Sequence, residues 1–210
     1  MIEEPKLNND LNTLSNVTEY LTQYDYIEDS SINNEYIDNV ILESGEFFRC
    51  KFNNTTFFVC NLEKAYFCDC VFTNCDLSNI DFTNVSLKKC IFIDCKLNNA
   101  NLNTSYLDNV SFKECIMRDS TFYDANFKDT EFINCDMTHS LLSEVKLKNV
   151  SFNNCNLLEC DFVKTKLSGI DFTTCIIDGI ILTQNDLKGA IFTTMQAVSF
   201  LKILGIKIKD

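Results

Sequence analysis

The sequence has few of the residues that several common protein classes require. It contains no Trp, one Pro, one His and five Gly among 210 residues. The longest apolar-leaning stretch, 189–201, has only 13 residues, which is too short to cross a bilayer as a helix. The first residues are acidic, whereas a signal peptide begins with basic ones. We therefore expect a soluble, cytoplasmic protein with no membrane partner.

What the chain does contain is enough apolar material for a large core. The apolar share is 46%, including 18 Phe and 12 Cys, which excludes a disordered chain. Acidic residues outnumber basic ones by 30 to 18, for a formal net charge of −12. Because nothing marks the chain for export, we expect the cysteines to be reduced thiols rather than a disulfide framework.

The dominant feature is a repeat of five residues that runs without interruption from Ile27 to Phe192. Every fifth residue in this range is large and apolar: 15 Phe, 13 Leu, 4 Ile and 2 Met. From Cys50 to Ala190 the residue two places before each large one is small or β-branched, with Asn185 as the exception. Eleven of the 12 cysteines occupy this small position, and Cys68 is the outlier. The remaining positions are mostly Asn, Asp, Thr, Ser, Lys and Glu.

Neither a helix nor a plain strand has a period of five. Five helical steps of about 100° would carry the apolar residue around the helix surface, and a strand alternates with period two. A three-residue extended segment followed by a turn does fit. In that segment the small residue and the large residue point to the same side, and the other residues face water.

The number of repeats in one coil follows from identities twenty residues apart. Phe recurs at every fourth large position from Phe52 to Phe192, and Cys recurs at the same interval from Cys75 to Cys175. Four pentapeptides per coil predict a square cross-section with like residues stacked about 4.8 Å apart. The 34 repeats then make about eight coils. The pattern itself does not give the hand, although chain chirality favours right-handed crossovers.

These residues resemble the pentapeptide-repeat family, whose pattern is A(D/N)LxX. The segments 99–103 (Asn-Ala-Asn-Leu-Asn) and 74–78 (Asn-Cys-Asp-Leu-Ser) show it plainly. The resemblance covers about four-fifths of the chain. It implies an all-β solenoid, specifically a right-handed quadrilateral β-helix.

An open coil end needs a cap, so the two termini are expected to differ from the repeat. We divide the chain into an acidic N-terminal cap (1–26), the β-helix (27–193) and a C-terminal segment (194–210). Leu7, Leu11, Leu14 and Leu21 have helical spacing, which predicts a short helix over about 6–22. At the other end we expect a helix over 194–204, a stop at Gly205 and an edge strand over 206–208.

The C-terminal sequence is similar to that of one branch of the family, which holds the gyrase-protecting quinolone-resistance proteins and the mycobacterial fluoroquinolone-resistance protein. The similarity rests on 186–189, Gln196-Ala197 and 204–208. In that branch the terminal segment forms a two-fold dimer. The resemblance therefore implies a homodimer. We expect its interface to contain Met195, Val198, Leu201, Leu204, Ile206 and Ile208.

The sequence offers no catalytic, cofactor or metal site. Pairs such as Cys70 and Cys75 have a spacing that zinc ligands use, but the repeat alone generates it, and the histidines of a zinc site are missing. We interpret the cysteines as core residues, with disulfides along the row disfavoured by side-chain geometry. His139 falls on an outward turn position. A filled prism also offers no concavity for an enzyme.

Charge is distributed unevenly along and around the expected rod. Residues 1–50 hold 11 acids and 2 bases, and residues 51–210 hold 19 acids and 16 bases. One wall carries seven lysines against four aspartates. The outward side of the Cys75–Cys175 row carries the acids that we expect to bind a partner: Asp76, Asp119, Asp136, Glu159 and Asp178.

Two function hypotheses follow. The first is a non-enzymatic acidic rod that imitates duplex DNA and binds DNA gyrase or topoisomerase IV, without binding nucleic acid itself. The second is an interaction scaffold that binds an unknown partner through the lysine wall or the acidic N-terminus. A mixed, solvated surface without a binding role also fits the charge pattern.

Overall fold

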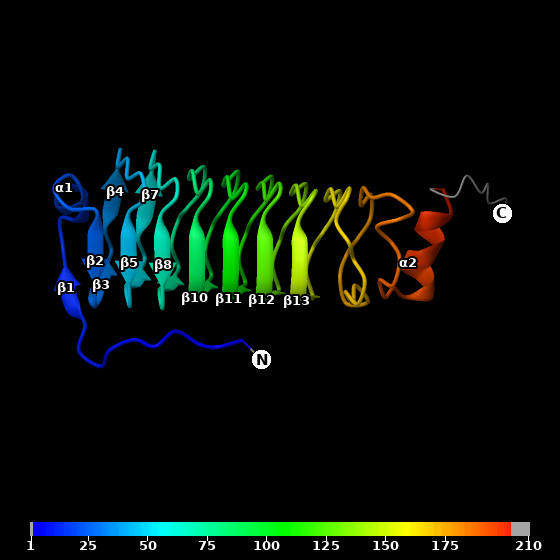
Figure 1. The fold of residues 1–210 in the computed structure, drawn as a ribbon, viewed down its shortest axis with the longest axis horizontal. Coiled ribbons are helices and arrows are strands. Elements are labelled where there is room, and N and C mark those ends of the chain that lie inside the picture. The colour runs from blue at the N-terminus through cyan, green and yellow to red at the C-terminus, as the bar shows by residue number, and fades with distance from the viewer. Residues whose placement is uncertain (1, 203–210) are drawn as a thin grey trace.

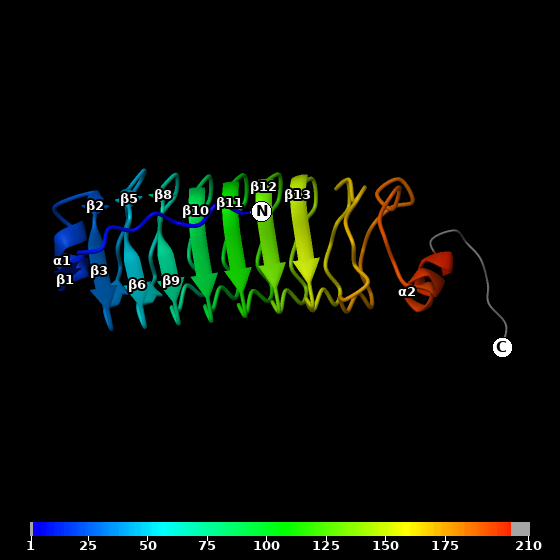
Figure 2. The same cartoon turned by 90° about the horizontal axis from the view of Figure 1, so that it is seen from below.

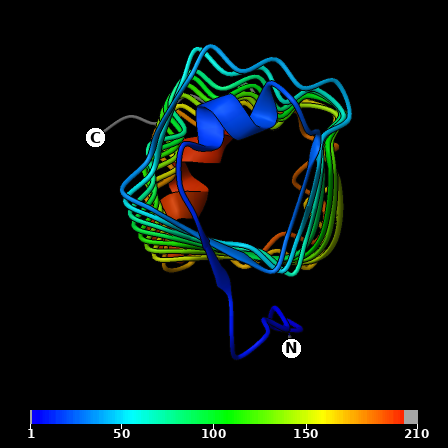
Figure 3. The same ribbon diagram turned by 90° about the vertical axis from the view of Figure 1, so that its left-hand side faces the viewer.

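The structure is a computed structural model that describes residues 2–202. Over this range the chain forms the predicted β-solenoid, a straight rod with a square cross-section (Figures 1 and 3). Seen from the N-terminal end, the chain turns clockwise as it recedes, so the coil is right-handed (Figure 3). In these described residues no helix is both long and apolar enough to cross a membrane.

The strands are short at the N-terminal end and longer in the middle of the rod. The three- and four-residue strands are β1 (Asn12–Leu14), β2 (Tyr26–Glu28), β3 (Ser30–Asn33), β4 (Tyr36–Asp38), β5 (Glu46–Phe48), β6 (Lys51–Asn53), β7 (Thr56–Phe58), β8 (Tyr66–Cys68) and β9 (Val71–Thr73). The eight-residue strands are β10 (Ser86–Ile93), β11 (Tyr106–Lys113), β12 (Asn126–Ile133) and β13 (Lys146–Asn153). The helices are α1 (Val17–Leu21), α2 (Thr194–Ser199) and a 3-10 turn (Phe200–Lys202).

Successive coils pair in parallel with a register of twenty residues. Phe92 of β10 pairs with Phe112 of β11, which pairs with Phe132 of β12. The eight-residue strands continue around one corner and so belong to two adjoining faces. On the other two faces β4 pairs with β7 at the N-terminal end, and the later coils are joined by single bridges such as Asp76 to Lys96.

We name the four faces by their central buried rows. The lysine face contains Phe67, Leu87 and Leu107; the Phe-ladder face contains Phe72, Phe92 and Phe112; the Cys-ladder face contains Leu77, Leu97 and Met117; the fourth face contains Phe82, Leu102 and Phe122. The lysine face is turned to the viewer in Figure 1, and the Phe-ladder face in Figure 2.

The chain turns each corner at a residue with left-handed backbone. Every fifth residue from Asp29 to Lys164 has a positive φ between 48° and 61°, apart from Ser44 at 72°. Most of these residues are Asn or Asp, whose short polar side chains tolerate this conformation. Gly169, Gly179 and Gly189 occupy the same position in the last coils. The regular corner therefore explains how so few glycines suffice.

The core consists of stacked rows, as the repeat predicts. The eight phenylalanines from Phe52 to Phe192 stack in one column, with successive ring centroids 4.6–6.0 Å apart. The inward cysteine thiols donate hydrogen bonds to main-chain carbonyls of the preceding coil, as Cys160 does to Met137 at 2.8 Å. Ser120 and Thr165 make the equivalent bond to Leu97 and Leu142 at 2.5 and 2.6 Å. The small position thus satisfies a backbone acceptor as well as filling space.

The N-terminal cap differs from the predicted helix over 6–22. Only Val17–Leu21 is helical, and β1 precedes it, pairing with β3. Val17 and Leu21 are buried over the first coil. The predicted short helical cap is present as α1, but its predicted extent was wrong: β1 satisfies the unpaired edge of β3, and a helix there would leave that edge open. Residues 2–9 contain no helix or strand and run along the outside of the rod (Figure 2).

The C-terminal end contains the expected helix in shorter form. α2 ends at Ser199 and is followed by the 3-10 turn. Gly205 and the expected strand 206–208 lie outside the described residues. The register also shifts locally where the small position is Asn185: Asn185 is exposed and Asp186 is buried instead. The Asp186 carboxylate accepts hydrogen bonds from the Thr183 N–H and hydroxyl, both at 2.7 Å.

Candidate protein-interaction surfaces

The carboxylates singled out from the sequence lie together on the Cys-ladder face. Asp76 and Asp136 belong to one row of bridges, and Asp119 and Glu159 occupy a corner row. Asp178 lies on the same face in a later coil. Asp119, Glu159 and Asp178 are exposed, whereas Asp76 and Asp136 are half-buried.

Two of these carboxylates are held by neighbours on the face. Asp136 accepts hydrogen bonds from the Thr138 N–H at 3.1 Å and hydroxyl at 2.6 Å, and it pairs with Arg118 at 2.7 Å. Burial raises the pKa of Asp136, but the bonds from Thr138 and Arg118 outweigh burial and leave the pKa below its ordinary value. Asp76 lies 3.9 Å from Lys96. Asp136 therefore has a structural role in its turn.

The single histidine lies between the two corner carboxylates. His139 Nδ1 is 3.3 Å from Asp119, and Nε2 is 3.4 Å from Glu159. The three residues are one coil apart, and each is about half exposed. His139 has a φ of 60° and faces solvent, as expected of an outward turn residue.

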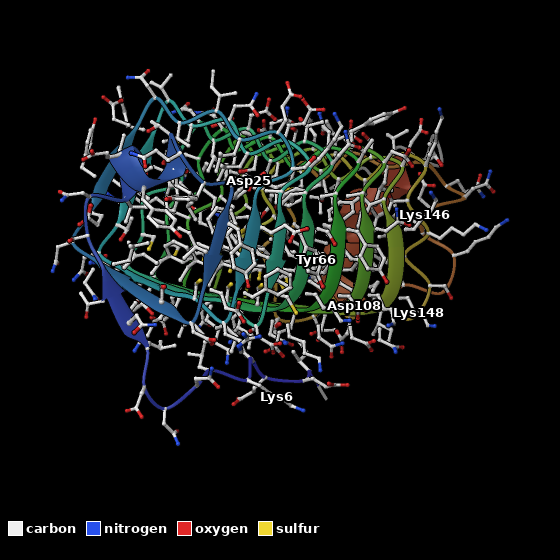
Figure 4. All side chains as sticks on the ribbon, turned by 60° about the vertical axis from the view of Figure 1, so that its left-hand side comes forward. Lys6, Asp25, Tyr66, Asp108, Lys146 and Lys148 are labelled. Atoms are coloured by element: carbon white, nitrogen blue, oxygen red, sulfur yellow. The ribbon has the colours of Figure 1, made fainter. Side chains whose placement is uncertain are left out.

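The lysine face has acids at its N-terminal end and lysines toward its C-terminal end. Lys128 pairs with Asp108 at 3.0 Å, and Lys146 with Asp124 at 3.4 Å. Within residues 2–202, Lys148 and Lys166 form no ion pair. Figure 4 shows Lys146 and Lys148 projecting from β13 away from the rod. A hollow of ≈ 430 Å³ lies here, lined by Asp124, Glu144, Val145, Lys146, Leu147, Lys164 and Lys166.

The acidic N-terminal arm, residues 2–9, contacts the corner between the lysine and Phe-ladder faces. The Lys6 N–H donates to Asp69 at 2.8 Å, and the Glu3 N–H donates to Asn109 at 2.9 Å. Three extended residues span about 10 Å, which matches two coils of about 4.8 Å. Glu3 also pairs with Lys89 at 2.6 Å. That hydrogen bond and charge lower the pKa of the Glu3 carboxyl.

Sequence reasoning missed this arm contact. Its only available signal was the acidic charge of residues 3 and 4 opposite the lysine row. Because residues 2–9 lack the five-residue repeat, the sequence pattern did not predict where they lie on the rod.

The cysteines are free, and all except Cys68 are buried. Burial raises the pKa of Cys160 to about 12 and holds that of Cys70 well above its ordinary value. In the described part of the chain, no group of three or more His, Cys, Asp or Glu side chains is arranged to hold a metal ion.

The C-terminal end combines a cap with an exposed apolar side. Gln196 Nε2 donates to the carbonyls of Phe172 and Cys175 at 2.8 and 2.9 Å, and Phe200 packs on Phe192. Met195 and Val198 point outward, with 88% and 47% exposure. Leu201 is partly buried. Of the expected dimer contacts, Leu204, Ile206 and Ile208 lie outside the described residues.

Comparison with known proteins agrees with this geometry. The family model described as "pentapeptide repeat region" matches residues 65–132 and 125–200. The chain belongs to the pentapeptide-repeat family.

Solved structures of pentapeptide-repeat proteins are similar to this chain at low sequence identity. Full-length QnrB1, a plasmid-mediated fluoroquinolone resistance protein, is 17% identical over 84% of this chain and 100% of its own, with a TM-score of 0.51. HetL, a pentapeptide repeat protein involved in heterocyst differentiation regulation from the cyanobacterium Nostoc sp. strain PCC 7120, is 14% identical over 84% of this chain and 94% of its own, with a TM-score of 0.44. A search of curated proteins gave no match.

Proposed function

We propose that the protein is a non-enzymatic binding protein whose acidic rod occupies the DNA site of a cytoplasmic type II topoisomerase, DNA gyrase or topoisomerase IV. It would modulate the enzyme or protect it from quinolones or a toxin. The observation that carries the proposal is the set of exposed carboxylates on one rigid face: Asp119, Glu159 and Asp178. The nearby Arg118 is already bound to Asp136.

The physical basis is electrostatic complementarity. DNA-binding proteins attract phosphates with grooves of Lys and Arg, and an acidic protein is attracted by the same field. The whole chain carries a net charge of −12, most of it in residues 1–50. The solenoid fixes its carboxylates in rows one coil apart, so binding requires little ordering of the rod.

The choice of a topoisomerase rests on the resemblance at 186–208 to the quinolone-resistance branch. QnrB1, whose description is that of a fluoroquinolone resistance protein, shares the fold. The exposed apolar side of α2 supports a two-fold dimer, because an isologous partner would bury Met195 and Val198. We include Leu201, Leu204, Ile206 and Ile208 in the proposed interface.

A second candidate function is that of a protein-interaction scaffold that binds through the lysine face. The observation that favours it is the concentration of lysines without ion pairs within residues 2–202, Lys148 and Lys166 among them, toward the C-terminal end of that face. A partner with an acidic surface would fit there.

A gyrase supercoiling assay with matched variants distinguishes the two. The triple variant Asp119→Asn, Glu159→Gln, Asp178→Asn removes three exposed charges and keeps side chains of nearly the same size and shape. Asn also suits the left-handed backbone at position 119. The matched control is Lys148→Gln with Lys166→Gln. We leave Asp136 unchanged because Thr138 depends on it.

We expect the wild-type protein to inhibit supercoiling at low salt, with the effect fading as salt screens the charges. The triple variant should inhibit less and the lysine control should inhibit normally. Deletion of residues 2–9 tests the arm. If the arm deletion abolishes inhibition and the triple variant does not, the partner binds the arm and the DNA-mimic proposal fails. If gyrase is unaffected by every form, the scaffold function is favoured.

A further inference from the structure

Four exposed apolar side chains lie at the N-terminal end of the rod, on the Cys-ladder face and around its corner with the fourth face. Tyr36, Ile41, Phe58 and Val59 are 58%, 73%, 50% and 61% exposed. The Tyr36 and Phe58 rings stack with centroids 5.8 Å apart, from the paired strands β4 and β7 (Figure 1). Val59 follows Phe58 directly, and Ile41 lies around the adjoining corner. We call this set the apolar patch.

The backbone at Val59 costs stability without any return in packing. Val59 has a φ of 52°, which is unfavourable for a β-branched residue. The same corner row elsewhere carries polar residues or Gly: Asn39, Asn79, Asn99, Asp119, His139, Glu159 and Gly179. A valine that is strained and 61% exposed is not explained by folding.

Thr104 shows what compensates a β-branched side chain at such a corner. Its φ is 58°, and its hydroxyl bonds to Asn84 at 2.8 Å and to the Asn103 carbonyl at 2.6 Å. Val59 has no polar atom with which to make such bonds. The Thr104 side chain therefore stabilises the coil through hydrogen bonds, whereas the Val59 side chain adds only exposed apolar surface.

Three carboxylates lie near the strands that carry Tyr36 and Phe58. Asp38 pairs in register with Phe58, and Glu19 and Glu35 line an open hollow of ≈ 380 Å³ beside Tyr36. Among residues 2–202, these three acids form no ion pair with Lys or Arg. Residues 1–50 carry 11 acids and 2 bases. The patch is therefore an apolar centre with an acidic rim.

The acidic rim determines which kind of partner can bind the apolar patch. Two copies joined through these ends would bring two acidic rims together, which is repulsive. A partner segment with apolar side chains flanked by Lys or Arg matches both the apolar centre and the acidic rim. Apolar anchors would cover Val59 and Ile41, and a cation would lie over the rings of Tyr36 and Phe58.

We propose that the apolar patch is the docking site for a basic, amphipathic segment of a partner protein. The patch extends the Cys-ladder face, so the inference rests on the proposed function only for the basic character of the partner. It adds an apolar anchor, which a charged rod alone lacks, and salt screens such an anchor little.

The test uses a defined probe, a fluorescein-labelled amphipathic peptide of Leu and Arg, titrated with the full-length protein by fluorescence anisotropy. The variants are Val59→Asn and Ile41→Thr. Matched controls are Thr104→Asn, which changes the other β-branched corner, and Leu141→Thr, which changes an exposed apolar residue in the row of Ile41. A second peptide replaces Leu with Ser at constant charge.

We expect Val59→Asn and Ile41→Thr to weaken binding of the Leu/Arg peptide by about tenfold or more. Both controls should bind like wild type, and the Ser/Arg peptide should bind wild type weakly. Because Asn suits the corner, Val59→Asn should also melt at a higher temperature, so weaker binding cannot be attributed to unfolding.

Equal binding of the Leu/Arg peptide to wild type and to both patch variants overturns the proposal. Equal binding of the Ser/Arg and Leu/Arg peptides to wild type also overturns it, since charge alone would then suffice. Self-association of wild type that Val59→Asn abolishes would make the occupant a second copy instead. The gyrase assay tests the proposed function separately from the patch. If the Asp/Glu triple variant loses gyrase inhibition but still binds the Leu/Arg peptide, the result concerns the proposed function and leaves the patch proposal unchanged.

Discussion

Each corner of the rod depends on one residue that adopts left-handed backbone. Asn99 is a clear example, with a φ of 54° and an exposed side chain. Asn and Asp tolerate this region because their short polar groups bond locally, whereas a Cβ branch clashes with the following carbonyl.

Replacing Asn99 with Val should therefore destabilise the protein by about 1–2 kcal/mol. Asn99→Gly is the control, because Gly adopts this backbone without strain, and it should lie closer to wild type. Urea denaturation measures both. Equal stability of the Val variant and wild type would mean that corner backbone does not limit sequence choice.

The twelve thiols should differ sharply in reactivity. Cys68 is half-buried and should react first with a thiol reagent, while the other eleven should react only on unfolding. Burial raises the pKa of Cys68, so little thiolate is present near neutral pH and its labelling should be slower than that of free cysteine. The rate should rise as pH increases from about 7 to 9. Mass spectrometry of native protein labelled over time would detect the order. Early labelling of Cys115 or Cys135 contradicts it.

At the scale of the element, the unit of stability is the coil stacked on its neighbours. Phe112 is fully buried between Phe92 and Phe132, with ring centroids 4.8 and 5.1 Å away. Because parallel pairing on both sides fixes these coils, the surroundings cannot collapse into a vacated site.

Phe112→Ala should accordingly cost about 3–5 kcal/mol of unfolding free energy. Ile116→Ala, which truncates an exposed side chain in the next pentapeptide, should cost much less. Thermal and urea melts of the two variants give the comparison. A Phe112→Ala protein that melts like wild type would show that the ring is not buried as described.

The repeat made the coil predictable because register, period and burial all follow from one pattern. Ile27, Phe112 and Phe172 are buried as the five-residue spacing requires. The end elements were less predictable. The leucines of residues 7–21 have helical spacing, but pairing of β1 with β3 prevailed. Asn185 at a small position indicated a local departure from the five-residue repeat, but only the structure shows that Asp186 is buried in its place.

The candidate surfaces were predictable only in part. The repeat places Asp119 and Glu159 in one corner row, so their proximity followed from the sequence. The binding of Arg118 to Asp136 did not, because side-chain reach between neighbouring rows is not fixed by register. The apolar patch could have been detected from Val59, the one valine at a corner position.

On the scale of the whole molecule, the two ends are chemically distinct. The N-terminal end combines α1, acidic side chains and the apolar patch, whereas the C-terminal end presents Met195 and Val198 outside a cap made by Gln196 and Phe200. The proposed dimer contact and the proposed partner-binding surfaces therefore lie on different parts of the rod.

Substituting Asp for both Met195 and Val198 should yield a folded monomer. Both side chains are exposed, so the cap remains intact, while two charges disfavour burial in an apolar interface. Thr194→Asp, which adds charge at the start of α2, is the control and should leave the dimer. Sedimentation at micromolar concentration measures the oligomeric state of each variant. A wild-type protein that sediments as a monomer refutes the proposed dimer.

The most direct measurement of the central claim is competition for DNA gyrase. A fluorescent linear duplex bound to gyrase is titrated with the full-length protein at increasing salt, alongside the triple variant Asp119→Asn, Glu159→Gln, Asp178→Asn. The proposal predicts displacement of the duplex at low salt, less displacement as salt rises, and weaker displacement by the triple variant. A duplex that stays bound at saturating protein, or that is displaced equally by both forms, contradicts it.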